Sequence, residues 1–414
     1  MTIAVIDTLI QTVDFSKPPR SGLVKSAMYD VEALRSKHEV YYAYYGIAQK
    51  GFEDYSIVLD NVGAKDHCII KGVKVSQSFQ KIKQDTPQII RRLKLIEGLD
   101  AIIVHVYSKS GYLDRIADKF PTLPILYVFH DAATNDDVFS TIGLIKRMKS
   151  LREFPNTIIS TNSYYTRNRI NKIIRNRIDD VIKHYDTFHQ NFDIENDKML
   201  FDHVYEYFTY GPKIDEIVDG EGYSINIGRY EASKGAKRLF NMHKHQNHLI
   251  TFFGVQDPIF DKELKYYNFM KDKTLAFPDH YAMNEGASDE LMIDIGRRAN
   301  NLIISCPTEG FGYTAFEMGI YGVPTIVIRQ GEDHATEEYL KKVGAFHKVF
   351  QIGSKDFYTN LYEAMKSYKI TLGERKENAK KFSDYFSIEN YITERETLLQ
   401  SKSIKKVRKI NELF

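Results

Sequence analysis

The sequence contains no tryptophan, only two cysteines and no long apolar run. Cys68 and Cys306 lie far apart and lack the spacing of metal ligands, so we expect no structural disulfide and infer a reducing compartment. No stretch approaches the roughly 18 apolar residues that a membrane span requires. The N-terminal stretch MTIAVIDTLIQTVDF also lacks the basic region of a signal peptide. Together these absences predict a cytoplasmic protein.

Charge of one sign is also lacking. The 57 Lys and Arg residues nearly balance the 55 Asp and Glu residues, so a charged partner has to be recognised by a local cluster. The chain is long, however, because 414 residues exceed the roughly 250 to 300 at which a single core tends to split. We therefore expect two domains.

Short apolar runs alternate with amphipathic stretches in both halves of the chain. In the first half we expect helices at 23–37 and 86–98 and strands at 3–9, 38–46, 99–108, 123–131 and 157–163. In the second half we expect helices at 236–245 and 289–299 and strands at 223–230, 248–255, 273–279, 301–306 and 323–328. Such alternation predicts parallel sheets with helices on both faces.

The stretch 208–222 is rich in turn-forming and acidic residues and is the expected linker. The predicted fold class is therefore α/β, with two Rossmann-like doubly wound domains at 1–210 and 222–380. A helical segment at 381–414 is expected to cross back to the first domain. In this architecture a ligand binds in the cleft that faces the carboxyl ends of both sheets.

One strand, turn and helix pattern carries specific chemistry. The apolar run NLIISC is followed by TEGFG and then by the helical stretch YTAFEMGIYG. The free amides between Gly310 and Thr314 would favour a phosphate, because unpaired N–H groups and the helix dipole both attract anions. Glu309 lies before the turn and Glu317 after it, where carboxylates can accept hydrogen bonds from a sugar and from a ribose.

This pattern resembles the E-x7-E signature of retaining glycosyltransferases with the two-domain GT-B architecture, in particular the glycogen-synthase-like family. Glu309 and Glu317 match its two glutamates, and Gly322-Val323-Pro324 matches its following strand entry. Upstream, INIGRYEASKG resembles the stretch in which an arginine and a lysine hold the nucleotide diphosphate. The resemblance therefore implies that Arg229 and Lys234 stabilise the leaving group without a metal.

The remaining site residues also follow from the resemblance. Gly22 stands where the family has a glycine-rich loop, normally with two adjacent glycines, and VFHD places His130 and Asp131 near the sugar and the acceptor. Glu309, His130 and Asp131 are the candidate catalytic residues. The candidate residues for the nucleotide sugar, a UDP sugar by resemblance, are Gly22, Arg229, Lys234, Gly310, Phe311, Gly312, Tyr313, Thr314 and Glu317. No metal and no other cofactor is expected.

A basic stretch in the first domain is the clue to the acceptor. Residues 146–183 carry ten basic residues against three acidic ones. The basic residues are Lys146, Arg147, Lys149, Arg152, Arg167, Arg169, Lys172, Arg175, Arg177 and Lys183. This excess suggests a polyanion or an anionic membrane surface as partner, and ordinary solvated helices are the alternative.

The chain also resembles, more loosely, bacteriophage α-glucosyltransferases that modify hydroxymethylcytosine in DNA, through ILYVFHD, GRYEASKGAKRLFNMHK and GFGY. A hydroxylated base in duplex DNA is therefore the preferred acceptor, and the host cytoplasm is then the location. A lipid-linked or cell-surface glycan is the alternative, with 170–185 against a membrane. A third possibility is a GT-B binding subunit that has lost its chemistry. No obligate protein partner is evident from the sequence.

Overall fold

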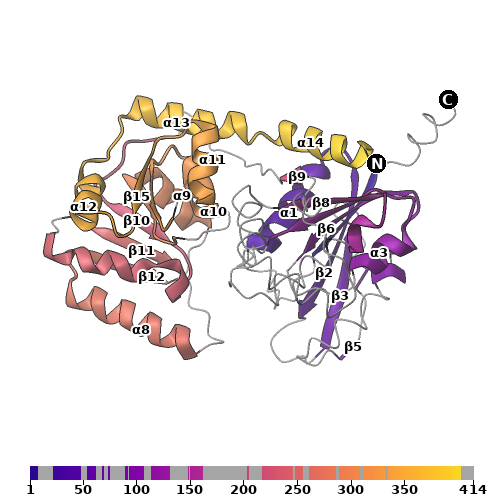
Figure 1. Cartoon of the computed structure of the whole chain (residues 1–414), viewed down its shortest axis with the longest axis horizontal. Coiled ribbons are helices and arrows are strands. Elements are labelled where there is room, and N and C mark those ends of the chain that lie inside the picture. Colours follow the sequence, from indigo (N-terminus) through magenta and orange to yellow (C-terminus); the bar gives the residue numbers. More distant parts are fainter. Residues whose placement is uncertain are drawn as a thin grey trace, which may run out of the picture. The chain divides into compact units, whose positions relative to one another are not determined.

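The computed structural model describes residues 1–7, 22–47, 54–61, 68–69, 73–74, 89–91, 93–106, 113–130, 148, 150–161, 203–204, 217–245, 248–254, 261–285, 289–307, 312–331 and 334–401. The chain divides into two compact units (Figure 1). Unit 1 comprises Met1–Phe208 and Ile388–Phe414, and unit 2 comprises Thr209–Ser387. The predicted boundaries at 210 and 222 stay predictions, because residues 205–216 lie outside the described part.

Unit 1 is built on a nine-stranded sheet of order β4-β3-β2-β1-β6-β7-β8-β9, with β5 paired to β3. Its strands are β1 (Thr2–Asp7), β2 (Glu39–Ile47), β3 (Asp54–Asn61), β4 (Cys68–Ile69), β5 (Val73–Lys74), β6 (Leu99–Val106), β7 (Ile125–Phe129), β8 (Thr157–Thr161) and β9 (His203–Val204). From β2 to β9 the pairs are parallel, whereas β3 is antiparallel to β2, β4 and β5. The sequence did not predict these antiparallel strands.

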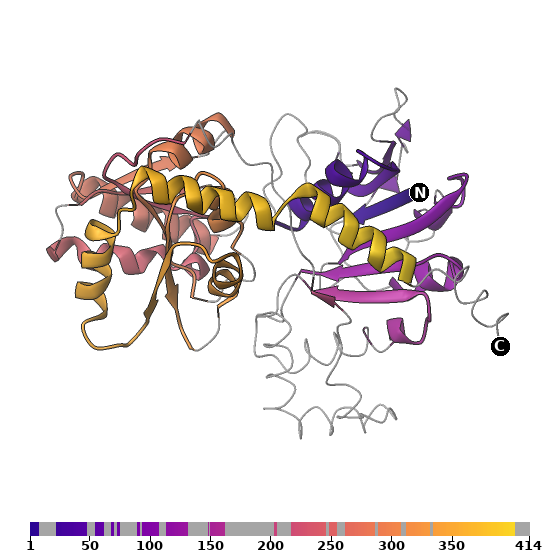
Figure 2. The same cartoon turned by 90° about the horizontal axis from the view of Figure 1, so that it is seen from above.

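The centre of this sheet is apolar because helices cover it. All residues of β7 and β8 are buried, as are 101–106 of β6. The labelled helices of the unit are α1 (Gly22–Leu34), α3 (Leu113–Lys119) and α14 (Ile388–Ser401). On α1 the buried residues Ala27, Val31 and Leu34 recur at helical spacing, and α14 packs on both α1 and β7 (Figure 2).

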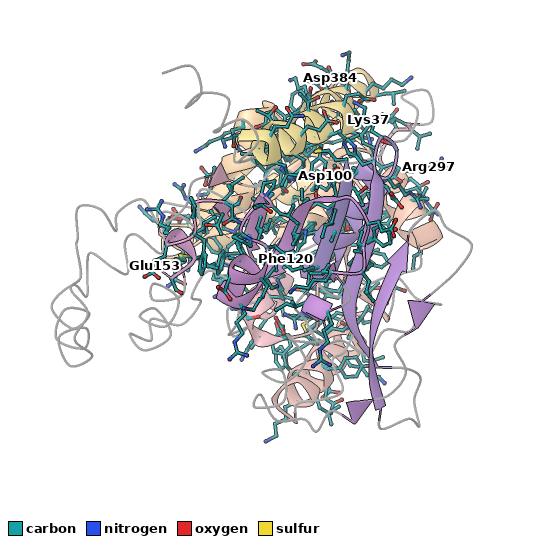
Figure 3. The ribbon with its side chains drawn as sticks, turned by 90° about the vertical axis from the view of Figure 1, so that its right-hand side faces the viewer. Lys37, Asp100, Phe120, Glu153, Arg297 and Asp384 are labelled. Carbon is teal, nitrogen blue, oxygen red and sulfur yellow. The ribbon has the colours of Figure 1, made fainter. Side chains whose placement is uncertain are left out.

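At the amino edge of the same sheet, the amide of Thr2 donates to Asp100 Oδ2 at 2.9 Å. Figure 3 labels Asp100 and also Lys37, which precedes β2. The carboxyl ends of β1, β2, β6, β7 and β8 therefore meet at the opposite edge.

Unit 2 has a six-stranded, wholly parallel sheet of order β12-β11-β10-β13-β14-β15. Its strands are β10 (Ser224–Ile227), β11 (Ile250–Gly254), β12 (Tyr281–Glu285), β13 (Asn301–Ile304), β14 (Thr325–Arg329) and β15 (His347–Gln351). The helices are η2 (Ala232–Lys234), η3 (Ala236–His245), α8 (Asp261–Ala276), α9 (Asp289–Arg298), α10 (Tyr313–Gly319), α11 (Ala335–Val343), α12 (Phe357–Ser367) and α13 (Leu372–Tyr385). One core cluster joins the strands to η3, α8 and α12.

The strand predicted at 273–279 was wrong. Residues 273–276 form the last turn of α8, and the strand follows at Tyr281–Glu285. The buried face of α8, with Tyr267 and Met270, continues the helical period to this point, and Thr274 Oγ1 donates to the Met270 carbonyl at 2.9 Å. Tertiary packing of this face outweighed the local pattern of KTLAFPD.

The helical stretch at 380–399 consists of two helices. Residue 381 lies inside α13, which ends at Tyr385, and α14 begins at Ile388. Phe386, between them, is buried against the rings of Phe316 and Phe382. The chain therefore returns to unit 1 at Ile388.

A buried guanidinium holds α13 to the rest of unit 2. Arg375 is 2% exposed and donates to three carbonyls, those of Tyr321 at 3.1 Å, Ala299 at 2.9 Å and Gly296 at 2.5 Å. Burial lowers its pKa to about 10, although Asp219 and Tyr223 act in the opposite direction. Arg375 thus supplies donors to the carbonyl groups at the ends of α9 and α10, which helices leave unpaired.

We expect Arg375→Ala to destabilise unit 2 by about 3 kcal/mol, because two buried carbonyl oxygens and one partly buried carbonyl oxygen lose their donor. Hydrogen exchange in increasing urea would measure this as reduced protection of the peptide spanning 296–302. Lys380→Ala is the matched control, because Lys380 is an exposed cation of the same helix. Equal protection in the two variants would contradict this account of α13.

Candidate functional site

The candidate donor site lies at the carboxyl edge of the unit 2 sheet. Strands β10, β13 and β14 are parallel neighbours, so the segments that follow them emerge at the same edge. These segments begin at Gly228, Ser305 and Gln330. Ligands of open parallel sheets bind at such an edge.

After β10 the chain makes a tight turn that contains Arg229 and Lys234. The short helix η2 ends at Gly235, which has a left-handed φ of 71°. A Cβ atom at this position would lie 2.2 Å from the carbonyl oxygen of Ser305, so only glycine fits. Arg229 is half-exposed, and its Nη2 lies 3.1 Å from Oε1 of Glu231.

The turn after β10 is bonded directly to the end of β13. Ser305 Oγ donates to the carbonyl of Lys234 at 2.7 Å, and Asn226 Nδ2 donates to Ser305 Oγ at 3.0 Å. Asn226 also donates to the carbonyl of Ile303 at 2.7 Å. The segment with Arg229 and Lys234 is thus fixed against the strand that leads to Glu309, about 80 residues further along the sequence.

The predicted helix after the glycine-rich turn is α10, which has seven residues and begins at Tyr313. Gly312 precedes it with a φ of 86°, and a Cβ atom there would lie 2.1 Å from Thr336 Oγ1. Tyr313, Thr314 and Glu317 on α10 are all half-buried. Glu309, Gly310 and Phe311 lie outside the described residues.

The sequence did not predict two polar groups that frame this edge. His334 is buried, accepts from the amide of Thr336 through Nδ1 at 3.2 Å, and contacts the carbonyl of Cys306 through Nε2 at 2.8 Å. Arg329, at the end of β14, pairs with the buried Glu337 at 2.8 Å. Both groups join α11 to the strand ends, and GEDHATEEYL contained no pattern that would have revealed them.

At the carboxyl edge of unit 1, His130 follows β7 and is half-buried. Its Nε2 lies 2.9 Å from Nδ1 of His105 on β6, and Nε2 of His105 lies 2.8 Å from Oδ2 of Asp30 on α1. Arg395 Nε donates to Oδ1 of Asp30 at 3.2 Å, and the Tyr391 hydroxyl donates to the same oxygen. Only His130 of this group was predicted from the sequence.

The electrostatics of this group follow from burial and from its partners. Burial raises the pKa of Asp30, but the charge of Arg395 and the bonds from His105 and Tyr391 outweigh it, so the net pKa is lowered. For His130, burial and the neighbouring His105 hold the pKa well below its ordinary value, against the influence of Asp30. His130 is therefore neutral near pH 7.

The other predicted site residues of unit 1 are only partly described. Gly22 is the first residue of α1, and Arg152 is exposed at the end of a helical turn. The candidate base and the rest of the basic stretch lie outside the described residues, namely Asp131, Lys146, Arg147, Lys149, Arg167, Arg169, Lys172, Arg175, Arg177 and Lys183.

Neither a metal site nor a membrane span appears in the described part of the chain. No three His, Cys, Asp or Glu side chains come together there in a way that could hold a metal ion. None of the described helices combines the length and the apolar character needed to cross a bilayer.

The free energy of unfolding of unit 1 should fall on acidification from pH 8 to pH 5. Below about pH 6.5 the unfolded chain binds a proton at His130, whereas the folded chain does not, because the pKa of His130 is lowered in the folded state. His38 acts in the same direction, because burial lowers its pKa as well. Asp30 contributes to the free energy of unfolding above its ordinary pKa of 3.8. This contribution is lost only as the pH falls through the lower pKa that Asp30 has in the folded state.

The urea midpoint for exposure of β6 and β7, read by hydrogen labelling at one fixed pH, measures this dependence. His130→Gln should flatten the slope between pH 7 and pH 5, whereas His347→Gln in unit 2 should leave it unchanged. Equal slopes in the wild type and in His130→Gln would show that His130 does not titrate as its surroundings require.

No family model and no curated protein matches the sequence. Solved structures do match, however, over almost the whole chain. Sucrose-phosphate synthase from Thermosynechococcus elongatus has a TM-score of 0.63 at 13% identity, with 97% of this chain and 98% of that chain covered. Anabaena HepE in complex with UDP and glucose has a TM-score of 0.63 at 11% identity, with 97% and 100% covered.

The catalytic domain of starch synthase IV from Arabidopsis thaliana, bound to ADP and acarbose, has a TM-score of 0.60 at 12% identity, with 97% and 99% covered. At such low identity the likeness concerns the fold. It confirms the predicted fold class: the chain has the two-domain α/β fold of the GT-B glycosyltransferases.

Proposed function

We propose that this protein is a retaining glycosyltransferase that moves a sugar from a nucleotide sugar to an acceptor hydroxyl. The observation that carries the proposal is the bonded contact between the Arg229–Lys234 turn and the end of β13, at the ligand-binding edge of a GT-B fold. HepE was solved with UDP and glucose and the starch synthase with ADP, which supports a nucleotide-sugar donor.

In the proposed donor site, Arg229 and Lys234 bind the diphosphate. Negative charge grows on this group as the glycosidic bond breaks, and two fixed cations stabilise it without a metal. Glu317 accepts hydrogen bonds from the ribose, and Glu309 positions the sugar. The amides from Gly310 to Thr314 are assigned to the same phosphates by the resemblance.

Glu231 sets the direction of Arg229 in this proposal. It is mostly buried, accepts from Ser233 Oγ at 2.5 Å, and lies 3.1 Å from Arg229 Nη2. A guanidinium has five donors, so Arg229 can keep this contact and still offer a second edge to phosphate oxygens. The carboxylate thus orients an arginine that would otherwise sample many rotamers.

For the chemical step, the acceptor hydroxyl attacks on the face that the diphosphate leaves, which retains the anomeric configuration. The departing phosphate accepts the proton of that hydroxyl, so a strong protein base is not required. Asp131 is the secondary candidate for assisting this transfer. His130, at the carboxyl edge of unit 1, is assigned to a substrate hydroxyl.

Arg229→Ala or Lys234→Ala should lower kcat/KM with UDP-sugars about 10²-fold to 10³-fold, as the loss of one preorganised charge-stabilising donor does elsewhere. Release of UDP measures the rate, and calorimetry measures UDP affinity. Lys265→Ala is the matched control, because it removes an exposed cation of the same unit. Near-normal turnover of a variant that combines Arg229→Ala and Lys234→Ala would refute the assignment of these two cations to the diphosphate. UDP binding without any turnover in the wild type would favour a non-catalytic subunit.

The acceptor that we propose is a hydroxylated base in DNA, which the looser resemblance and the basic stretch 146–183 support. Its phosphate contacts would hold the backbone while the base leaves the stack. A glycan acceptor is the second candidate, and the acarbose bound to the starch synthase neighbour supports it. The binding of the two acceptors should depend differently on salt, because contacts with the DNA backbone release counterions and contacts with a neutral glycan do not.

Incubation with UDP-glucose and hydroxymethylcytosine DNA should give a glucosylated nucleoside in the α configuration, read by mass spectrometry and NMR. Binding to this duplex should weaken by at least about 10-fold between 50 and 200 mM salt, because even a few phosphate contacts produce a decrease of that size. Unmodified cytosine DNA is the control for transfer. A β-linked product would refute the retaining assignment, and salt-insensitive or absent binding would favour the glycan.

A further inference from the structure

One arginine beside the candidate donor site is half-buried without a side-chain partner among the described residues. Arg238 lies on the first turn of η3, directly after the Arg229–Lys234 turn. A guanidinium has five N–H donors. In the described part of the chain none of the five donates a hydrogen bond, and no carboxylate pairs with the charge. The proposed function gives Arg238 no role.

The glycine that ends the turn leaves the space in which this guanidinium lies. A Cβ atom on Gly235 would lie 2.4 Å from Nη1 of Arg238 and 2.2 Å from the carbonyl oxygen of Ser305. Because both atoms lie so close to the same point, the guanidinium is a neighbour of the end of β13. This is the edge of the sheet at which the candidate donor site lies.

The surroundings of Tyr266, on α8, also locate the charge of Arg238. Burial raises the pKa of the Tyr266 hydroxyl, the amide of Lys237 and the charge of Arg238 lower it, and the charge of Glu231 raises it. This hydroxyl accepts from the Lys237 amide at 2.8 Å. Arg238 therefore shares its surroundings with Glu231, which lies 3.1 Å from Nη2 of Arg229.

The charge of this segment is strongly positive. Residues 228–239 carry four cations and one carboxylate, Glu231. Lys237 is exposed, with its ammonium 5.0 Å from the ring centre of Phe269. The other three cations repel one another in a turn that is partly shielded from water, so an anion that joins them would be bound favourably. These cations are Arg229, Lys234 and Arg238.

A diphosphate fits this excess of positive charge. Each of its phosphoryl groups carries negative charge, and a planar guanidinium binds phosphate oxygens through two parallel N–H groups. The alternative is a solvated arginine whose methylene groups only cover the turn. The two explanations differ in what they predict for the binding of anions.

We propose that Arg238 is a third phosphate-binding cation of the donor site, which holds the diphosphate from the side of β13, next to Arg229 and Lys234. A donor activated by a single phosphoryl group would leave part of this charge unmatched, so the site selects sugars carried by nucleoside diphosphates. The sugar nucleotide rests on the proposed function, whereas the binding of a diphosphate beside Gly235 does not.

Calorimetry with UDP, UMP and uridine tests the assignment. Arg238→Gln removes the charge and should weaken UDP binding about 10-fold to 10²-fold, as the loss of a charge-assisted hydrogen bond does. The binding of UMP should weaken less, and that of uridine should not change. Arg238→Lys should recover part of the loss, because it restores the charge without the two parallel N–H groups.

Lys237→Gln is the matched control, because it removes the same charge at the neighbouring position of η3. It should change the affinity for UDP by less than about twofold, because solvent and salt screen an exposed charge. An equal loss in this control, an equal loss for uridine, or unchanged UDP affinity in Arg238→Gln would overturn the proposal. If Arg238→Gln does not fold, the same comparison of UDP with uridine is made with Arg238→Lys.

Inorganic pyrophosphate separates this proposal from the proposed function, because it contains phosphoryl groups but no nucleoside and no sugar. It should protect the amides of 228–239 from hydrogen exchange in the wild type but not in Arg238→Gln. Such protection without turnover of any sugar nucleotide would refute the proposed function and support the diphosphate site. Turnover of a UDP sugar that Arg238→Gln leaves unchanged would refute the role of Arg238 alone. Both proposals fail if the wild type binds neither UDP nor pyrophosphate.

Discussion

A carboxylate that is completely shielded from water must be matched by buried donors and cations, and in unit 1 this requirement falls on Asp30. Its two oxygens are approached by His105 from β6 and by Tyr391 and Arg395 from α14. Three elements that are far apart in the sequence are therefore fixed by one charge. If α14 moved away, Asp30 would lose the guanidinium of Arg395 that pairs with it, so the position of this helix and the ionisation of Asp30 depend on each other.

Unit 2 contains the opposite case, a buried cation, Arg375, that contacts no carboxylate among the described residues. Arg375 on α13 is matched by the carbonyls of Gly296, Ala299 and Tyr321, which lie at the ends of α9 and α10. The last two described helices thus each insert one arginine into a different unit. The run predicted at 380–399 is divided between α13, which Arg375 anchors upstream of that run, and α14, which Arg395 anchors. The buried ring of Phe386 lies at the break.

The parts of the fold that the sequence predicted are those with strong local signals. Buried parallel strands appear as apolar runs, and GRYEASKG and EGFGYTAFE combine glycines with charged residues at fixed spacing. The strand predicted at 273–279 was wrong because the packing of α8 outweighed the local pattern. The series ending at His130 had a weaker signal that can be recognised in retrospect. Asp30 interrupts the apolar face formed by Ala27, Val31 and Leu34, and His105 interrupts an apolar strand. Their partners on α14 are more than 285 residues away, so only the fold reveals why these polar residues are tolerated.

The two carboxyl edges are shaped in different ways, which suits different tasks. In unit 2 the backbone itself defines the edge, because Gly235 and Gly312 have left-handed backbones and close neighbours that exclude any side chain. A backbone fixed in this way presents Arg229 and Lys234 at set positions, as their proposed binding of a diphosphate of constant geometry requires. In unit 1 a series of hydrogen bonds from Asp30 through His105 holds the ring of His130 in place instead.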